Sequence, residues 1–399
     1  LTKTFAAHKK RTPSLQTEVH GSDFIEEAVN ALQFQGATRF SHAILNPPYR
    51  KINSQSSHRF LLRQAGIETV NLYTAFVALA LKLMKPGGEI VAIIPRSFCN
   101  GPYYRPFRTL LLEHAAIEHL HLFDSRTSAF SDDAVLQENI IIRVVVGRAQ
   151  GTVRISTSSD KSMTDFVAHD YPFRKIVAPN DPEIFIHIPH GASTDTPAPL
   201  PLASGSLRDA GLDISTGPVV DFRLKTFLLK EPTKTSAPLL YANHFVQGAL
   251  VWPRLDGKKP NAIAVTPDTE KWLYPNDGYY TVVRRFSSKE ERRRIVAYVV
   301  DPRNFKGSSK IGLENHLNVF HRGRKGLDEE TARGLAVYLN STAVDDHFRR
   351  FSGHTQVNAT DLKNMPYPSP EALKTLGVWA KSAAPLTQEQ IDHHLKTHE

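Results

Sequence analysis

HAILNPPY, residues 42–49, places a short apolar run directly before a polar residue and two prolines. The run is predicted to be a buried strand, because it is short, apolar and followed at once by loop residues. The two prolines fix φ, remove two backbone donors and push Asn46 into an extended conformation. We therefore expect a stiff loop after the strand, which presents hydrogen-bond acceptors only.

The surrounding sequence, from Val19 to about Val146, alternates short apolar runs with helical patterns. This alternation is typical of a parallel α/β sheet. A helix is predicted over Val70–Met84, because Lys85-Pro86-Gly87-Gly88 is a strong stop signal. The other predicted strands are Ile90–Ile94, His119–Phe123 and Ile140–Val146. Ligands bind at the carboxyl ends of strands in such sheets, so the loop at residues 46–49 lies where a site is expected.

Length and charge narrow the class of protein. With 399 residues, 41% of them hydrophobic, the chain can bury a core and is not disordered as a whole. Its net charge of +9 should attract phosphate polyanions or acidic membranes. The single cysteine, Cys99, cannot form an internal disulfide, and no apolar stretch is long enough to span a bilayer. A cytoplasmic protein is expected, with no membrane partner and no metal site.

The loop after the first strand suits one kind of chemistry. The side-chain oxygen of Asn46 and the carbonyl of Pro47 can both accept hydrogen bonds from one planar amino group, and the Tyr49 ring offers a stacking face. Two acceptors favour a tetrahedral nitrogen whose lone pair is free to attack. If the amine belongs to a base in duplex DNA, the base must be flipped out. The alternative is an ordinary turn, since Asn-Pro and Pro-Pro are common turn dipeptides.

On these residues the chain resembles the amino-group DNA methyltransferases that use S-adenosylmethionine. It is similar in particular to the gamma-class, TaqI-like adenine-N6 enzymes and the restriction–modification methylases. The resemblance implies a Rossmann-like methyltransferase sheet followed by a mixed α+β target-recognition domain. It assigns catalysis to the motif Asn46, Pro47, Pro48 and Tyr49.

Other segments carry the same resemblance. Gly21-Ser22-Asp23-Phe24 resembles the motif in which an acid binds the adenine amino group of the cofactor and the next residue packs on its ring. The resemblance thus implies that Asp23, Phe24 and Asn46 bind S-adenosylmethionine. Asn71–Phe76 resembles the helix start that borders the cofactor and target pockets. Phe130, before Gln137-Glu138-Asn139, is the candidate second aromatic against the flipped base.

Two of these assignments have structural alternatives. Asp23 also suits the N-cap of a helix beginning near Ile25, and both roles are compatible. Phe130 is equally compatible with a structural role, as a phenylalanine packed beneath a surface loop. The chain also departs from the family, because the glycine-rich cofactor loop and the acid for the ribose should precede residue 19 and neither is present there. Since residue 1 is Leu, we expect either a truncated chain or weak binding of the methyl donor.

The domain organisation is predicted from composition. Residues 1–190 are assigned to an N-terminally incomplete methyltransferase domain, and 191–202, rich in Ser, Thr and Pro, to a linker. A target-recognition domain is predicted at 203–375 and a polar helix or tail at 376–399. Helices are expected at 287–300, after a capping box of Ser288 and Glu291, and at 328–351.

The C-terminal half carries most of the excess positive charge. Residues 284–350 contain 15 Lys and Arg against 9 Asp and Glu. Phosphate contacts of such residues give affinity, while Asn, Gln and His can bind base edges. The alternative is a solvated helix face. The predicted DNA-binding residues are Arg284, Arg285, Arg292, Arg293, Asn315, His316, Gln356 and Asn358, with Asn318 a further base-reading candidate.

The sequence therefore predicts a site-specific methyltransferase that methylates N6 of a flipped adenine in double-stranded DNA. The resemblance leaves open a cognate restriction endonuclease as a second partner. Two alternatives remain: a non-catalytic DNA-binding or specificity subunit with a degenerate methyltransferase fold, or a methyltransferase that acts on RNA or on protein glutamine.

Overall fold

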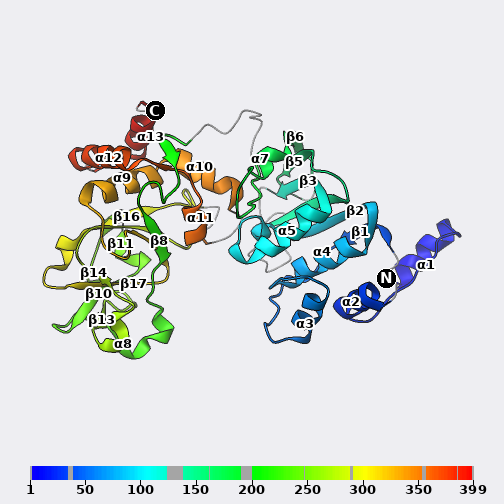
Figure 1. Ribbon diagram of the computed structural model, residues 1–399, viewed down its shortest axis with the longest axis horizontal. Coiled ribbons are helices and arrows are strands. Elements are labelled where there is room, and N and C mark those ends of the chain that lie inside the picture. Colours follow the sequence, from blue (N-terminus) through cyan, green and yellow to red (C-terminus); the bar gives the residue numbers. More distant parts are fainter. Residues whose placement is uncertain are drawn as a thin grey trace. The chain divides into compact units, whose positions relative to one another are not determined.

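The computed structural model describes residues 2–34, 39–123, 138–160, 162–189, 200–246, 248–287, 291–352, 356–383 and 385–397. The chain divides into two compact units, unit 1 from Leu1 to Ile184 and unit 2 from Phe185 to Glu399 (Figure 1). Most of the predicted linker lies outside the described residues, and Leu200 at its end packs into the core of unit 2. Among the described residues, no helix combines the length and apolar character needed to cross a membrane.

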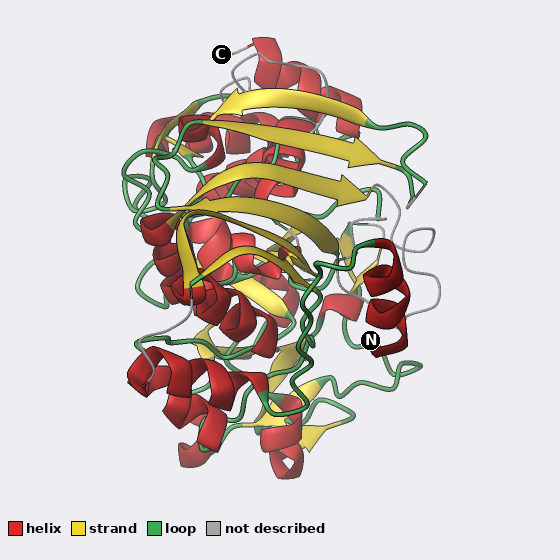
Figure 2. Cartoon of the chain, turned by 90° about the vertical axis from the view of Figure 1, so that its right-hand side faces the viewer, coloured by secondary structure: helices red, strands yellow, loops and turns green. Residues whose placement is uncertain are grey.

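Unit 1 is built on a six-stranded sheet in the order β1-β2-β4-β3-β5-β6 (Figure 2). The predicted strands are confirmed, and β5 and β6 extend the sheet. The bounds are β1 Phe40–Leu45, β2 Met84–Pro95, β3 Ala115–Phe123, β4 Asn139–Val146, β5 Thr152–Ser158 and β6 Val167–Pro172.

The prediction of a parallel sheet is wrong in part. β1 runs parallel to β2, and β3 runs parallel to β5. β4 lies antiparallel to both β2 and β3, and β6 antiparallel to β5. A strand buried on both faces is apolar along its whole length in either direction, so an apolar run such as 140–146 does not reveal its direction.

The helices of unit 1 include the predicted one, α4. Their bounds are α1 Thr2–Arg11, α2 Phe24–Phe34, α3 Ser57–Gln64, α4 Leu72–Leu83, the 3₁₀-helices η1 Arg96–Cys99 and η2 Pro102–Tyr104, α5 Arg105–His114 and α7 Phe173–Ile176. α4 and α5 pack against each other, α4 also on β1 and β2, and α5 on β3 (Figure 1). α4 is apolar almost all round, and its central residues, such as Ala78, are fully buried, as expected for a helix covered on several sides.

The predicted stop after α4 takes the form of a bulge. Phe40 of β1 pairs with Met84 of β2 and His42 pairs with Glu89, so residues 85–88 project from the ladder. Gly87 adopts φ of +77°, which favours glycine, and a Cβ on Gly88 would lie 2.9 Å from the carbonyl oxygen of Lys85. The paired glycines therefore allow the chain to turn directly from helix into strand.

Unit 2 is a mixed α+β unit, which confirms the predicted class. Its sheets have the orders β14-β17-β10-β13-β9, β16-β15-β18-β8, β11-β12 and β19-β7. The strands are β7 Ala203–Gly205, β8 Asp213–Thr216, β9 Leu228–Leu229, β10 Ser236–Leu240, β11 Phe245–Val246, β12 Ala249–Leu250, β13 Ala262–Ala264, β14 Tyr274–Pro275, β15 Tyr280–Arg284, β16 Ala297–Val300, β17 Lys310–Leu313, β18 Leu317–His321 and β19 Tyr367–Pro368.

The helices of unit 2 are α8 Pro267–Glu270, α9 Glu329–Leu339, α10 Thr342–Phe351, α11 Ala359–Lys363, α12 Pro370–Ser382 and α13 Gln388–Thr397, with the 3₁₀-helices η3 Asp221–Arg223, η4 Lys225–Phe227, η5 Ala242–His244 and η6 Pro302–Phe305. In the four-stranded sheet, α9 packs on β15 and β16 and α11 packs on β8. The predicted helix at 328–351 is two helices, α9 and α10. α9 and α12 meet at Gly334 and Gly377, where a Cβ would lie 1.8 Å from a carbonyl oxygen of the other helix. Glycine at these positions lets the two backbones touch.

The predicted helix at 287–300 is wrong, because β16 occupies residues 297–300 and the described residues before it are irregular. The carboxylate of Asp345 accepts hydrogen bonds from the backbone N–H groups of Arg294 and Ile295, at 2.7 and 2.8 Å. The side chain of Asn340 bonds both the N–H and the carbonyl of Ala297. These groups belong to α9 and α10 or the turn between them, so contacts distant in sequence outweigh the local helix signal.

Candidate active site

The predicted catalytic loop follows β1 at the carboxyl end of that strand. Asn46 and Pro48 are exposed, Pro47 is buried, and Tyr49 is half-buried. The amide of Asn46 is therefore open to a ligand, as its predicted role requires. Because β1 pairs with β2 on one side, the loop lies next to the carboxyl end of β2 as well.

Backbone pairing fixes the loop to the start of α4. Lys51 and Asn71 form an isolated antiparallel bridge. On either side of it, the N–H of Ile52 donates to the carbonyl of Val70 and the N–H of Leu72 donates to the carbonyl of Arg50, both at 2.8 Å. The rigidity expected from the prolines is thus extended by hydrogen bonds to a buried helix.

The hydroxyl of Tyr49 and the ring of Tyr73 help to fix the Tyr49 ring. The hydroxyl donates to the carbonyl of Ile93 at 3.1 Å and lies 3.3 Å from Oδ1 of Asn46. The Tyr73 ring meets the Tyr49 ring edge-on, with centroids 6.2 Å apart at 87°. A hydroxyl has one proton, and the shorter contact is to Ile93, so Oδ1 of Asn46 keeps its capacity to accept from a substrate.

Tyr73 belongs to a cluster of polar groups, only part of which the sequence singled out. The hydroxyl of Tyr73 lies 2.9 Å from Oγ of Ser97, and burial raises the pKa of that phenol well above its usual value. The hydroxyl of Tyr104 accepts from Nδ2 of Asn71 at 2.7 Å and from Oγ of Ser97 at 3.3 Å. Only Asn71 and Tyr73 carried a signal, through the motif at 71–76. Ser97 and Tyr104 reach the site through folding alone.

The structure confirms the N-cap alternative for Asp23. Its Oδ1 accepts from the N–H groups of Ile25 and Glu26 at 2.9 and 3.2 Å, and its Oδ2 lies 3.0 Å from Nε2 of His58. The carboxylate is 41% exposed, so both oxygens keep lone pairs for another donor. Phe24 packs on Phe76 of α4 with ring centroids 4.8 Å apart. An accessible acceptor beside an aromatic ring fits an aromatic amine such as the adenine of S-adenosylmethionine.

The remaining predicted elements of unit 1 are only partly described. Phe130, the candidate second aromatic, lies outside the described residues. Glu138 follows that segment and forms a buried ion pair with Arg96, with Nη1 and Oε1 3.2 Å apart. The backbone N–H of Arg96 also donates to the carbonyl of Glu138 at 2.7 Å, so the start of β4 is fixed to the end of β2. Glycine-rich turns before β1 are absent from the described residues 2–34.

In unit 2 the structure gathers four of the predicted DNA-binding residues. The guanidinium of Arg285 donates to the carbonyl of Asn315 at 3.1 Å and to Oε1 of Gln356 at 3.3 Å. The N–H of Arg285 donates to the carbonyl of His316 at 2.8 Å. Three segments far apart in sequence therefore form one surface.

The other predicted DNA-binding residues are elsewhere. Arg284 pairs with Glu291, and Arg292 is exposed. Arg293 was expected in the helix predicted at 287–300, which is not formed. Its guanidinium donates to Gln388 at 2.8 Å and to the carbonyl of Ser341 at 2.9 Å, and burial lowers its pKa.

Two of the polar candidates serve the fold. Asn358 caps α11, with Nδ2 donating to Asp361 at 3.0 Å. Asn318 is fully buried within β18 and donates to the carbonyl of Val357 at 2.7 Å. The base-reading role considered for Asn318 is wrong, because a fully buried amide cannot reach DNA.

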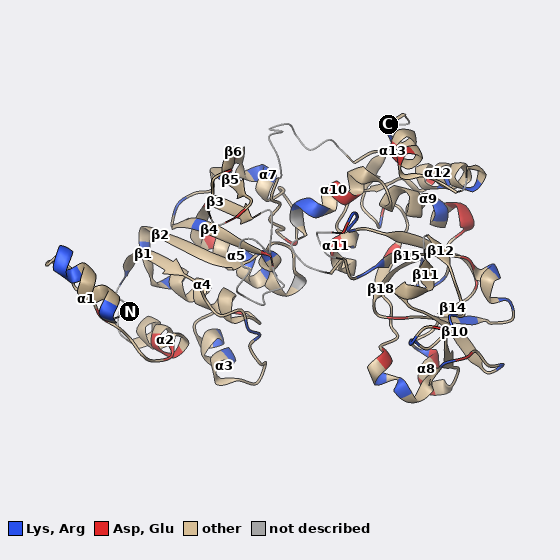
Figure 3. Ribbon diagram, turned by 180° about the vertical axis from the view of Figure 1, so that it is seen from behind, with Lys and Arg blue, Asp and Glu red and all other residues tan. Residues whose placement is uncertain are grey.

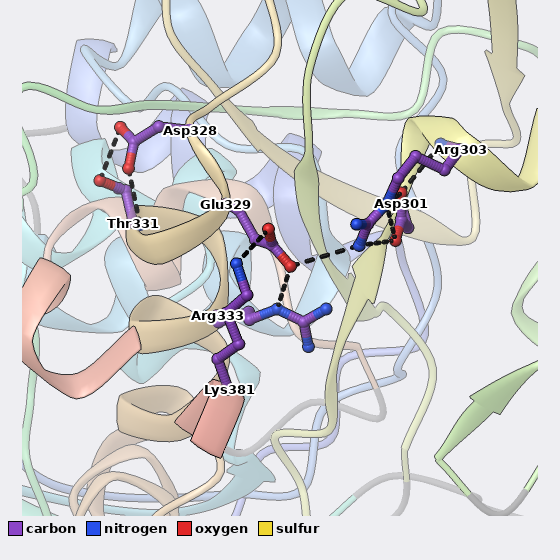
Figure 4. A network of polar contacts seen from close by, with 7 residues as sticks. All are labelled: Asp301, Arg303, Asp328, Glu329, Thr331, Arg333 and Lys381. Atoms are coloured by element: carbon purple, nitrogen blue, oxygen red, sulfur yellow. Dashed lines mark hydrogen bonds and ion pairs between the residues drawn. The ribbon is translucent and has the colours of Figure 1, made fainter. Parts of the chain in front are cut away.

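Part of the positive charge in this half is neutralised internally. Glu329 at the start of α9 lies within ion-pair distance of Lys381, Arg333 and Arg303, at 2.9, 3.0 and 3.3 Å (Figure 4). Hydrogen bonds from Lys381 and Arg333 lower the pKa of Glu329 to about 2. In the ribbon of Figure 3, Asp and Glu positions (red) lie close to Lys and Arg positions (blue) around α9 and α10. Within the described ranges, no three His, Cys, Asp or Glu residues are grouped so as to hold a metal ion.

Comparison with known proteins adds independent information. The family model described as Eco57I restriction-modification methylase matches residues 4–130. The Type II methyltransferase M.BsuBI of Bacillus subtilis is 50% identical over 403 residues, covering 99% of this chain and 80% of that protein. The Type II methyltransferase M.PstI of Providencia stuartii is 44% identical over 370 residues, covering 90% of this chain and 71% of that protein.

Solved structures resemble the chain more distantly. The Type IIL restriction-modification enzyme MmeI in complex with DNA is 13% identical, with a TM-score of 0.49, over 90% of this chain and 52% of that one. The DrdV–DNA complex is 11% identical, with a TM-score of 0.46, over 87% of this chain and 44% of the other.

Proposed function

We propose, on the premise that this chain belongs to the Type II methyltransferases of restriction–modification systems, that it transfers a methyl group from S-adenosylmethionine to N6 of adenine in a specific duplex DNA sequence. The membership itself confirms the resemblance to restriction–modification methylases found in the sequence. The acceptor atom, the cofactor and the site residues are the proposed part. The main observation in support of this proposal is that Asn46 is exposed at the carboxyl end of β1. It is followed by two prolines and by Tyr49, whose hydroxyl is hydrogen-bonded to the backbone.

The loop prepares the target nitrogen for attack. The amino group of adenine is a poor nucleophile, because its lone pair is delocalised into the ring. Oδ1 of Asn46 and the carbonyl of Pro47 accept hydrogen bonds from its two N–H groups, which favours a tetrahedral nitrogen with the lone pair directed outward. These hydrogen bonds strengthen as positive charge develops on the nitrogen, so they stabilise the transition state more than the ground state.

The Tyr49 ring receives the base once it leaves the helix stack. Stacking offsets part of the unpairing cost, and the contacts to Ile93 and Tyr73 mean that the ring does not have to be ordered when the base arrives. S-adenosylmethionine, when bound, supplies a methyl group on a positively charged sulfur, and Asp23 and Phe24 would hold its adenine. Transfer of that methyl group to the target nitrogen would leave a neutral thioether, and the methylated nitrogen would then lose one proton to water.

Unit 2 supplies DNA contacts in this proposal. Its surface of Arg285, Asn315, His316 and Gln356, with the exposed Arg292, offers donors for phosphates and bases. A cognate endonuclease that cuts the same unmethylated sequence is the corresponding partner in a restriction–modification system.

Mass spectrometry of nucleosides identifies the product directly. Duplex DNA incubated with the protein and methyl-labelled S-adenosylmethionine should yield labelled N6-methyladenine, and Asn46→Ala should yield at least a hundredfold less. Label found only in RNA or in protein glutamine would overturn the proposal. Tight sequence-specific DNA binding without transfer would instead indicate a specificity subunit.

A further inference from the structure

Unit 2 carries a compact polar surface around one exposed phenylalanine. We call it the Arg285–His316 surface, and it consists of Arg285, Phe286, Asn315, His316 and Gln356. Phe286 is 42% exposed and meets the His316 ring with centroids 4.9 Å apart at 51°. The backbone of Phe286 also forms an isolated antiparallel bridge with that of Gln356. His316 and Gln356 are therefore both neighbours of Phe286.

A buried carboxylate fixes the orientation of His316. Glu314 is fully buried, and its two carboxylate oxygens lie 2.7 and 2.8 Å from Nδ1 of His316. The same carboxylate accepts from the backbone N–H of His316 at 2.9 Å. Nδ1 thus faces the interior, and Nε2 faces away from it on a side chain that is 41% exposed. Among the described residues, Nε2 has no hydrogen-bond partner.

Gln356 is oriented in a similar way. Its Oε1 accepts from Arg285, and within the part of the chain that the structure describes its amide nitrogen donates to no other group. The charge of Arg285 lies beside this amide, and its other terminal nitrogen is bound to the carbonyl of Asn315. The surface thus presents donors from two fixed side chains together with a positive charge.

We propose that His316 and Gln356 bind the major-groove edge of a guanine in the recognised DNA sequence, and that Glu314 is the residue that positions the imidazole. The guanine edge offers two neighbouring acceptors, N7 and O6, whereas the adenine edge pairs one acceptor with a donor. Two donors side by side match guanine and mismatch adenine. In this contact Nδ1 donates to Glu314, Nε2 donates to N7 of the guanine, and the amide nitrogen of Gln356 donates to O6. This inference rests on the proposed function, because it requires that unit 2 contact DNA.

Replacement of single atoms in DNA tests the contact. The recognised sequence is first identified by selecting, from a pool of randomised duplexes, those that the full chain binds. Each guanine of a duplex with that sequence is then replaced in turn by 7-deazaguanine, which lacks N7. We expect one replacement to weaken binding to the unaltered protein about tenfold and to leave binding to His316→Ala unchanged. A recognised sequence without guanine, or no position with this coupling, would overturn the proposal.

Matched variants separate this contact from general effects. With Glu314→Gln, that one replacement in the DNA should weaken binding by less than about threefold. If the replacement still weakens binding about tenfold, Glu314 does not position His316. Arg292→Ala should weaken binding to all duplexes alike and leave the penalty intact. If His316→Ala behaves like Arg292→Ala, the histidine contacts phosphate and the proposal is overturned. Melting temperatures check folding of each variant.

The binding assay does not depend on methyl transfer. If one guanine shows the His316-dependent loss of binding but the product assay finds no N6-methyladenine, this contact is supported and the proposed function is rejected. If methyl transfer occurs but no guanine shows that dependence on His316, the proposed function is supported and this contact is rejected.

Discussion

Replacing Tyr49 by phenylalanine and by alanine separates the roles of its hydroxyl and its ring. The hydroxyl makes one well-formed hydrogen bond, 3.1 Å to the carbonyl of Ile93, and such a bond contributes about 1 kcal/mol net. Tyr49→Phe should therefore lower kcat/KM by roughly fivefold. Tyr49→Ala also loses the stacking surface, worth about 1–3 kcal/mol per base. Together these losses predict a decrease of roughly 30-fold to several hundredfold.

Two measurements check this prediction. Steady-state methyl transfer on a short duplex gives kcat/KM, and a duplex with 2-aminopurine at the target position reports base flipping by its fluorescence. Tyr49→Phe should keep most of the fluorescence increase and Tyr49→Ala should lose most of it. If Tyr49→Phe lowers kcat/KM as much as Tyr49→Ala does, the hydroxyl and not the ring is responsible for the contribution of Tyr49. If Tyr49→Ala is nearly as active as the unaltered protein, no base stacks there.

Three further predictions concern stability and reactivity. Because the pKa of Glu329 is lowered from 4.5 to about 2, its contribution is complete above about pH 4.5 and is lost as the pH falls toward 2. Glu329→Gln should lower the free energy of unfolding by about 1–2 kcal/mol at pH 7. If urea titrations give the same difference between variant and unaltered protein at pH 2, the ion pairs of Glu329 do not stabilise the fold. Arg294→Ala removes a buried guanidinium that is bonded to Ser287 and Ser352, and should lower the free energy of unfolding by about 3 kcal/mol. The exposed Arg292→Ala should lower it by less than about 0.5 kcal/mol. Similar urea midpoints for the two variants would contradict the structural role of Arg294. Burial raises the pKa of the Cys99 thiol to about 12, so a maleimide at pH 8 should label native protein at least about a hundredfold more slowly than unfolded protein; equal labelling rates would contradict that burial.

The catalytic loop and its neighbours could be predicted because their signals are local. An apolar run before two prolines locates a strand end, and a cation, a proline and two glycines locate the end of α4. Both signals depend on backbone constraints that act within a few residues. The same reasoning gave the N-cap role of Asp23, which the structure confirms.

Features set by contacts distant in sequence could not be predicted. The direction of β4 depends on its neighbours in the sheet, since its apolar residues suit either direction. The segment around Arg294 resembles a helix start, but Asp345 and Asn340 take its backbone groups and it joins a strand instead. Ser97 and Tyr104 carry no pattern in the sequence, and they meet Asn71 and Tyr73 only after folding.

The central claim is that the side-chain oxygen of Asn46 accepts a hydrogen bond from the target amine in the transition state. The most direct test is the single-turnover rate of methyl transfer by Asn46→Ala at saturating DNA and S-adenosylmethionine. Removal of one preorganised hydrogen-bonding group from a transition state costs about 100- to 1000-fold in rate. We predict a loss of that size with DNA affinity changed by less than about threefold, and a rate within about threefold of the unaltered protein would contradict the claim.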